Sequence, residues 1–153
     1  MITIADILDV RHVDLNLKQT SQQEAIFSVA SMLKDDDRVL EWNQFYGGLK
    51  SSHAAVAAEH DFELCIPHTR TNSVSGMVMS AGRTAQGVTF QNSEATIHYI
   101  FVIGVPSALA ADYLRIIGAL ARIFKDTGAE KKLRVAKEPT DFLALLSSME
   151  MKL

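Results

Sequence analysis

The spacing of hydrophobic and polar positions predicts one short strand followed by helices over residues 13–61. Hydrophobic residues two positions apart over residues 13–17 predict a short, half-buried strand. The segment Ser21–Glu24 matches a capping box, and the hydrophobic spacing after it predicts a helix over about residues 22–34. The three aspartates at 35–37 are expected to form a solvated turn. A second helix is expected over 39–49, with a break near Gly47-Gly48, and the alanine-rich residues 51–61 favour further helix.

The second half of the chain predicts three more strands and two regular helices. Short strands are expected over residues 62–66, closed by Pro67, and over 74–79. The run 95–105 is hydrophobic on both faces, which is typical of a central strand covered by helices. Residues 113–124 have helical spacing, 133–136 are expected to be a short edge element, and Pro139 opens a last helix. This order predicts an α/β three-layer sandwich with a mixed β-sheet flanked by helices.

Composition and charge restrict the class of protein. The chain is 48% hydrophobic and 22% charged, which argues against disorder. Its 15 Lys and Arg against 18 Asp and Glu give a net charge of −3, so no basic surface is expected for nucleic acid. No hydrophobic run reaches the ~18 residues of a membrane helix, and Met1–Asp14 lacks the pattern of a signal peptide. We therefore expect one domain over residues 1–153, located in the cytoplasm, without membrane insertion.

Several kinds of chemistry find little support in the sequence. The single cysteine, Cys65, cannot form an internal disulfide or a cysteine-based zinc site, and we expect it to be buried in a strand. His53 and His60 lie one to two helical turns apart, so a two-histidine metal site is a minor alternative. Gly47–Ser51 lacks the ordered spacing of a nucleotide-binding loop. We expect neither a metal nor a cofactor.

His68 stands out among the five histidines because of its context. It follows a short hydrophobic strand and Pro67, and it precedes Thr69 and Arg70. A hydroxyl, the backbone amides of a turn and a guanidinium beside an imidazole suit a phosphoryl group. Imidazole can attack phosphorus and forms a labile, transferable phosphoramidate. Short Pro-His strings also occur by chance, so a merely structural histidine remains open on this evidence.

The order of elements and the segment Ile66-Pro67-His68 resemble the type-2 IIA domains of the bacterial phosphotransferase system. That family includes the fructose and mannitol IIA domains and the nitrogen-regulatory IIA protein. The resemblance covers nearly the whole chain, at residues 4–8, 13–15, 21–33, 87–90 and from the strand before Pro106 to the helix after Asp112. It implies an α/β sandwich with a mixed sheet. It also implies that His68 accepts a phosphoryl group from the carrier protein HPr, or its nitrogen-branch counterpart, and passes it to a IIB domain or holds it as a regulatory signal.

Three positions depart from the family pattern. Ser52-His53 stands where the family has Arg-Glu, the acidic segment 57–63 stands where it has Ser-Thr, and Tyr113-Leu114 stands where a histidine leads the later helix. We expect Arg70 to hold phosphoryl oxygens, His53 to supply a proton or partial positive charge, and Tyr113 to donate a hydrogen bond. Solvated His53 and Arg70, and a Tyr113 that only packs, are the alternatives. The departures also leave open a degenerate IIA-like module that binds a regulatory partner without phosphotransfer.

Overall fold

The computed structural model describes residues 1–56, 64–90 and 96–153, and these ranges form a mixed sheet of five strands. The strand order is β1-β4-β5-β2, and β3 also pairs with β5. β5 runs antiparallel to β4, whereas β2 and β3 run parallel to β5 and β1 runs parallel to β4. The strands span Leu8–Asp14 (β1), Leu64–Cys65 (β2), His68–Arg70 (β3), Val78–Thr89 (β4) and Thr96–Val105 (β5).

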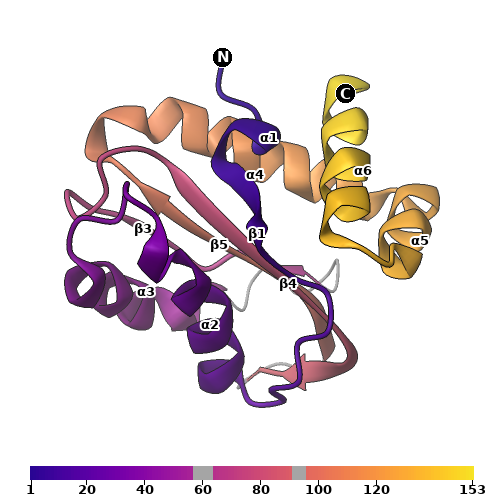
Figure 1. Cartoon of the computed structure of the whole chain (residues 1–153), viewed down its shortest axis with the longest axis horizontal. Helices are drawn as coiled ribbons and strands as arrows, with labels where there is room; N and C mark the ends of the chain where they lie inside the picture. The colour runs from indigo at the N-terminus through magenta and orange to yellow at the C-terminus, as the bar shows by residue number, and fades with distance from the viewer. Residues whose placement is uncertain (57–63, 91–95) are drawn as a thin grey trace.

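Helices cover both faces of this sheet (Figure 1). α1 (Ile4–Ile7), α4 (Ala110–Lys125), α5 (Thr127–Val135) and α6 (Pro139–Met151) lie on one face. α2 (Gln22–Ser31) and α3 (Trp42–Val56) lie on the other. Two short 3-10 turns, η1 (Met32–Asp35) and η3 (Ser107–Leu109), join neighbouring elements.

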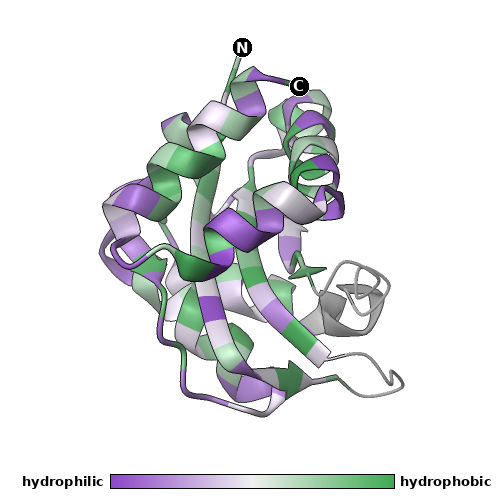
Figure 2. Ribbon diagram, turned by 90° about the vertical axis from the view of Figure 1, so that its right-hand side faces the viewer, coloured by the Kyte–Doolittle hydropathy of each residue, from purple (hydrophilic) through white to green (hydrophobic). Residues whose placement is uncertain are grey.

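The predicted central strand explains the three layers. Along β5, Phe101 and Ile103 pack into the hydrophobic cluster beneath α4 and α6, whereas Ile100 and Val102 pack into the cluster beneath α2 and α3. All four side chains are fully buried, because successive residues of a strand point to opposite faces. Figure 2 shows hydrophobic segments along the strands between the helices, with hydrophilic segments interspersed on the helices. The predicted three-layer sandwich with a mixed sheet is confirmed.

Two predicted strands have the wrong bounds. The first strand is Leu8–Asp14 rather than 13–17. Leu15 and Leu17 follow the strand and are buried, and the Leu17 amide donates to the Arg83 carbonyl, which explains why the alternating pattern continues past the strand. The strand expected over 74–79 begins only at Val78 and runs on to Thr89, since its later part includes polar residues that the hydrophobic pattern did not capture.

Helix signals were misplaced at two points. The capping box lies at Thr3–Asp6, where each residue's side chain bonds the other's backbone amide, whereas Ser21 begins α2 without a side-chain cap. The backbone of Ser21 instead forms an isolated β-bridge with Thr89. Residues 133–136 are not an edge element, because Leu133 lies buried in α5 and Ala136 follows that helix.

The remaining helices agree better with the hydrophobic pattern. α4 and α6 confirm the two helices expected after Pro106 and from Pro139. α3 begins at Trp42 and continues through Gly47-Gly48 to Val56 without the expected break. The predictions for 57–61 and for 62–63 lie outside the described residues. None of the helices in the described ranges has both the length and the hydrophobicity that crossing a membrane requires.

Candidate functional site

The candidate site is built on β3, a three-residue strand at the edge of the sheet away from β1. Proline has no amide hydrogen to donate, but the Pro67 carbonyl accepts a hydrogen bond of 2.9 Å from the Ile103 amide. The strand resumes at once, with His68 opposite Ile103 and Arg70 opposite Val105. β2 ends at Cys65, before Pro67, as expected, but pairing with β5 resumes at His68, which the sequence does not predict. This pairing fixes the backbone beneath His68.

The His68 ring is oriented by its own main chain. Its Nδ1 lies 2.8 Å from the carbonyl oxygen of Ile66. A carbonyl oxygen can only accept, so Nδ1 carries the proton and donates it, and the lone pair belongs to Nε2. The side chain is partly exposed rather than enclosed in the core. The ring is thus held in one tautomer with Nε2 as its basic, nucleophilic nitrogen.

Tyr113 packs against this ring from α4, in the helical layer over this face of the sheet. It lies near the start of α4, is 9% exposed, and its ring centroid is 5.0 Å from that of His68 at an interplanar angle of 44°. The structure therefore brings together two of the residues that the sequence singled out. Contact with an aromatic ring restricts the imidazole to a small range of orientations.

Arg70 and Thr69 lie on opposite faces of β3. Residues two apart in a strand share a face, so Arg70 follows His68 on the same side of the sheet. Arg70 is exposed, and within the described ranges no carboxylate pairs with it. Thr69 faces α3 instead: a Cβ added to Gly48 would lie 2.5 Å from its hydroxyl oxygen. The arginine thus lies on the histidine's side, whereas the threonine side chain points away from it.

His53 falls on the last turns of α3, and its side chain lies outside the described residues. His60 and the rest of the acidic segment 57–63 lie outside the described residues. The role expected for His53 therefore stays a prediction. Cys65 is 1% exposed in β2, which confirms the expected burial of that thiol. Within the described part of the chain, no three His, Cys, Asp or Glu side chains gather in a way that could hold a metal.

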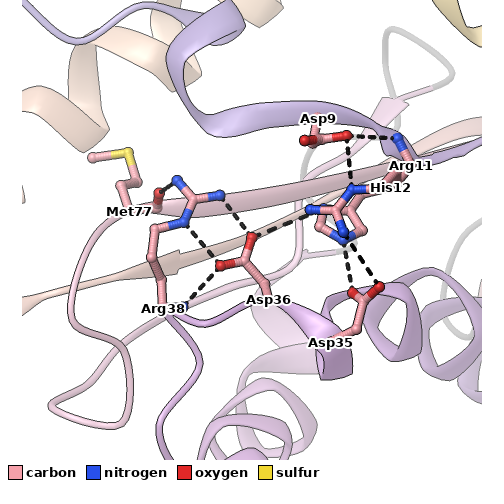
Figure 3. Close-up of polar contacts among 7 residues, drawn as sticks. All are labelled: Asp9, Arg11, His12, Asp35, Asp36, Arg38 and Met77. Carbon is pink, nitrogen blue, oxygen red and sulfur yellow. Dashed lines mark hydrogen bonds and ion pairs between the residues drawn. The ribbon is translucent and has the colours of Figure 1, made fainter.

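A second polar cluster, which sequence analysis missed, lies along β1 (Figure 3). His12 is 1% exposed, and its Nε2 lies 2.9 Å from an oxygen of Asp35. Asp36 is also buried, so the expected solvated turn is wrong at this residue. Arg38 donates to both oxygens of Asp36 and, at 2.9 Å, to the carbonyl of Met77. These hydrogen bonds lower the pKa of Asp36 from 3.8 to about 2.

The contacts of this cluster hold separate elements of the fold together. The cluster joins β1 to the turn after α2 and to Met77, the residue before β4, at the sheet edge opposite β3. Hydrophobic periodicity does not predict these contacts, because they join charged side chains to each other and to a backbone carbonyl up to 39 residues away in sequence. An Asp-x-Arg string at 36–38 was the one local signal available.

Sequence comparison places the chain in a family. Residues 6–149 match the family described as "Phosphoenolpyruvate-dependent sugar phosphotransferase system, EIIA 2". The chain belongs to this family. The match spans most of the chain and confirms the resemblance inferred from Ile66-Pro67-His68 and the order of elements. A curated member of similar sequence is the "PTS system fructose-specific EIIA component" of Haloferax volcanii, 25% identical over 135 residues that make up 88% of each chain.

Solved structures of EIIA proteins share the fold at low sequence identity. The nitrogen regulatory protein IIA-Ntr of Neisseria meningitidis superposes with a TM-score of 0.84 at 20% identity, covering 94% of this chain and 98% of that one. The IIA mannitol structure of Escherichia coli gives 0.75 at 16%, covering 90% and 97%. The complex of IIAMtl with phosphorylated IIBMtl from Escherichia coli gives 0.77 at 14%, covering 93% and 99%. The chain is thus a divergent EIIA type 2 protein that keeps the family fold.

Proposed function

We propose that this EIIA type 2 protein is a phosphocarrier whose acceptor is His68. The phosphoryl donor is phosphorylated HPr or its nitrogen-branch counterpart. The product is a phosphohistidine that is passed to a IIB partner or serves as a regulatory signal. The protein works in the cytoplasm, where such carriers and their phosphoenolpyruvate-derived phosphate are found.

The observation that supports this proposal most directly is the hydrogen bond from His68 Nδ1 to the Ile66 carbonyl. Because this bond holds the proton on Nδ1, Nε2 keeps its lone pair and acts as the nucleophile. In the transfer, the bond from phosphorus to the donor's imidazole nitrogen breaks as the bond to Nε2 forms. The donor nitrogen takes back the electron pair, and Nδ1 keeps its proton throughout. The positive charge left on the phosphorylated ring is shared with the Ile66 carbonyl dipole.

Two neighbours support the transfer electrostatically and sterically. Phosphoryl transfer is governed mainly by positioning and by stabilisation of charge on the phosphoryl oxygens. Arg70 is a cation on the same face of the sheet as His68, and we propose that it binds the phosphoryl oxygens. Tyr113 holds the imidazole plane through its ring contact. Thr69 contributes through its backbone in β3 rather than through its hydroxyl, which faces Gly48.

The test is phosphorylation of the purified chain followed by intact-mass measurement. One arm contains enzyme I, phosphoenolpyruvate and HPr from the same organism, and a second arm contains the nitrogen-branch carriers instead. We expect one added phosphoryl group, lost in mild acid as phosphohistidine is, and the arm that reacts faster identifies the branch. His68→Ala should accept none.

His98→Ala is the matched control, because His98 also donates from Nδ1 to a backbone carbonyl, that of Thr84, at 2.9 Å. This variant should be phosphorylated like the parent protein. Phosphate that persists on His68→Ala would overturn the assignment of the acceptor.

A second candidate function is a degenerate EIIA module that binds a regulatory partner without phosphotransfer. The observation that favours it is Tyr113, which packs on the His68 ring at the position where the family resemblance implies a second histidine. In that case neither arm adds mass. His68→Ala then binds unphosphorylated HPr, or the partner it regulates, as tightly as the parent protein does.

A further inference from the structure

A cavity of about 540 Å³ lies at the end of the sheet opposite His68. It is lined by the connection after β1, by the middle of β4, by the start of β5 and by α5. Tyr99 lines it, whereas His68 pairs with Ile103 four residues further along β5. Four residues of strand span about 13 Å, so the cavity and the proposed acceptor are separate sites. Its volume lies within the ~300–1,000 Å³ typical of small-molecule sites.

One wall of the cavity is a bulge built into β4. Arg83 pairs with Tyr99 and Val88 pairs with Ile97, so four β4 residues, 84–87, lie opposite His98 alone. Such bulges redirect side chains and are common beside functional sites. Gly87 has a φ of +85°, a conformation that other residues rarely adopt, and its amide donates to the Thr84 hydroxyl at 3.2 Å.

The imidazole of His98 closes the bulge. Its Nδ1 donates to the Thr84 carbonyl, and Thr84 itself is only 2% exposed. The bulge is thus held by specific hydrogen bonds rather than being a loose irregularity of the strand. It presents Ala85 and Gln86 to the cavity from a fixed backbone.

The charged residues of the cavity are predominantly positive. Among the described residues, Lys18, Arg83 and Arg134 line it together with a single carboxylate, that of Glu130. Glu130 is already matched, since it pairs with Arg134 and accepts a hydrogen bond of 2.6 Å from the Tyr99 hydroxyl. Three cations and one carboxylate leave two positive charges.

Arg83 is the most constrained of these cations. Its Nη1 donates to the carbonyls of Leu133 and Ala136 at 2.8 and 2.7 Å, and its Nε donates to Leu15 at 3.3 Å. These bonds fix the guanidinium, and they involve neutral carbonyls only. Among the residues that the structure describes, no carboxylate pairs with Arg83 or with Lys18, and the second amino group of Arg83, Nη2, has no protein partner.

We propose that this cavity binds a small organic oxyanion, with its phosphate or carboxylate group at Arg83 and Lys18. A fixed guanidinium with an unused amino group binds such oxygens with directed, charge-assisted hydrogen bonds. The amides of Asn16 and Gln86 line the same cavity and suit hydroxyl or carbonyl groups on the body of the ligand. The site is independent of phosphotransfer at His68.

Titration of the ¹⁵N-labelled protein by NMR, with calorimetry for the affinity, tests the proposal. The probes are glucose 6-phosphate for a phosphate-bearing anion, succinate for a carboxylate-bearing one, inorganic phosphate, and uncharged glucose as the control. We expect at least one of the three anions to shift the amides of residues 84–87, and glucose to leave them unchanged. Comparison of the anions identifies which oxyanion the cavity prefers.

Variants locate the binding to the cavity. Lys18→Glu changes an exposed side chain, so the variant should fold normally. Its affinity for the preferred anion should be about tenfold lower or more. Lys152→Glu, the same change at an exposed lysine near the C-terminus, should bind as the parent does. Arg83→Lys keeps the charge but loses the planar fork, and it should also weaken binding. His68→Ala should leave the affinity unchanged, which separates this site from the proposed phosphotransfer.

Two results would overturn the proposal. One is the absence of amide shifts around the cavity with every anion at about 10 mM, a concentration that detects even millimolar binding. The other is an affinity that stays the same in both Lys18→Glu and Arg83→Lys.

Discussion

Among the described residues, the charged side chains around His12 and those beside His68 differ in whether an opposite charge pairs with them. Around His12, each charge has an opposite partner: Arg38 binds Asp36, and Arg11 lies near both Asp9 and Asp35. Beside His68, Arg70 is exposed and, within the described ranges, pairs with no carboxylate. Paired charges hold a structure together, whereas an unpaired guanidinium can attract an incoming anion.

We predict that Arg70→Gln slows phosphorylation of His68 without preventing it. Removing the cation should lower the rate of phosphoryl transfer about 10- to 100-fold, because less charge on the phosphoryl oxygens is stabilised in the transition state. The measurement is the rate of mass increase at limiting phospho-donor. Arg122→Gln, an exposed arginine further along α4, serves as the matched control. Equal rates for the two variants would remove Arg70 from the mechanism.

At this scale the sequence predicts which residues lie near His68 but not the directions of their side chains. The Pro67-His68 string singled out the residue, and the ring contact with Tyr113 agrees with the expected grouping. Thr69 was expected beside His68 because the strand was thought to end at the proline. Once β3 resumes at His68, the alternation of a strand sends the Thr69 hydroxyl to the α3 side. Missing the three-residue strand β3 therefore places the Thr69 hydroxyl on the wrong face of the sheet.

The secondary-structure elements differ in how their ends are satisfied. α5 is capped at its N-terminus by Asp126, whose carboxylate accepts hydrogen bonds of 2.9 and 3.1 Å from the amides of Gly128 and Ala129. α2 begins at Ser21, whose hydroxyl caps no amide of the helix. Since α5 buries little besides Leu133, its stability depends strongly on that cap.

We predict that Asp126→Ala lowers the free energy of unfolding by about 1 kcal/mol, the usual cost of removing an N-cap. Ser21→Ala should cost less than about 0.5 kcal/mol, since no capping bond is lost. Urea denaturation of both variants measures the difference. A Ser21→Ala variant as unstable as Asp126→Ala would contradict the capping geometry.

Which elements were predictable follows from how much hydrophobic surface each one buries. β5, α4 and α6 carry long hydrophobic patterns, and each was predicted near its observed bounds. α5 has one buried hydrophobic residue within its span, so the hydrophobic pattern does not show its helical spacing, and the edge element predicted over 133–136 covers the last three residues of this helix and its C-cap. The Ser21–Glu24 string matched a capping box, but tertiary pairing of Ser21 with Thr89 is information that a local pattern does not contain.

For the molecule as a whole, the His12 cluster connects parts that are distant in the chain. Arg38 and Asp36 link the turn after α2 to Met77, the residue before β4, while His12 links it to β1. The side chain of Asp36 is 7% exposed, so its charge is poorly screened by solvent. Charge pairs of this kind make stability depend on pH.

We predict that Asp36 contributes to the stability of the whole protein in a pH-dependent way. Hydrogen bonds from Arg38 lower its pKa from 3.8 to about 2 in the folded state, so the folded protein favours the ionised form. This contribution is fully present above pH 3.8 and is lost as the pH falls through about 2. Asp36→Asn should therefore lower the free energy of unfolding by about 2 kcal/mol at pH 7, with a smaller difference at pH 2.

Unfolding in urea at a series of pH values measures this effect. Asp37→Asn is the matched control, because Asp37 is adjacent, exposed and makes no ion pair within the described ranges. It should change stability by less than about 0.5 kcal/mol at every pH. A constant difference between the two variants from pH 7 to pH 2 would show that Asp36 acts through packing rather than charge.

The tautomer of His68 has an evolutionary consequence. Its proton is fixed by an oxygen of the peptide backbone, two residues earlier, and not by a side chain. Substitutions that keep the path of the chain through Pro67 therefore preserve this tautomer, with the lone pair on Nε2, even when the surrounding side chains are exchanged. The nitrogen that we propose as the phosphoryl acceptor is thus set by the fold, and changes among its side-chain neighbours, such as Tyr113, leave it in place.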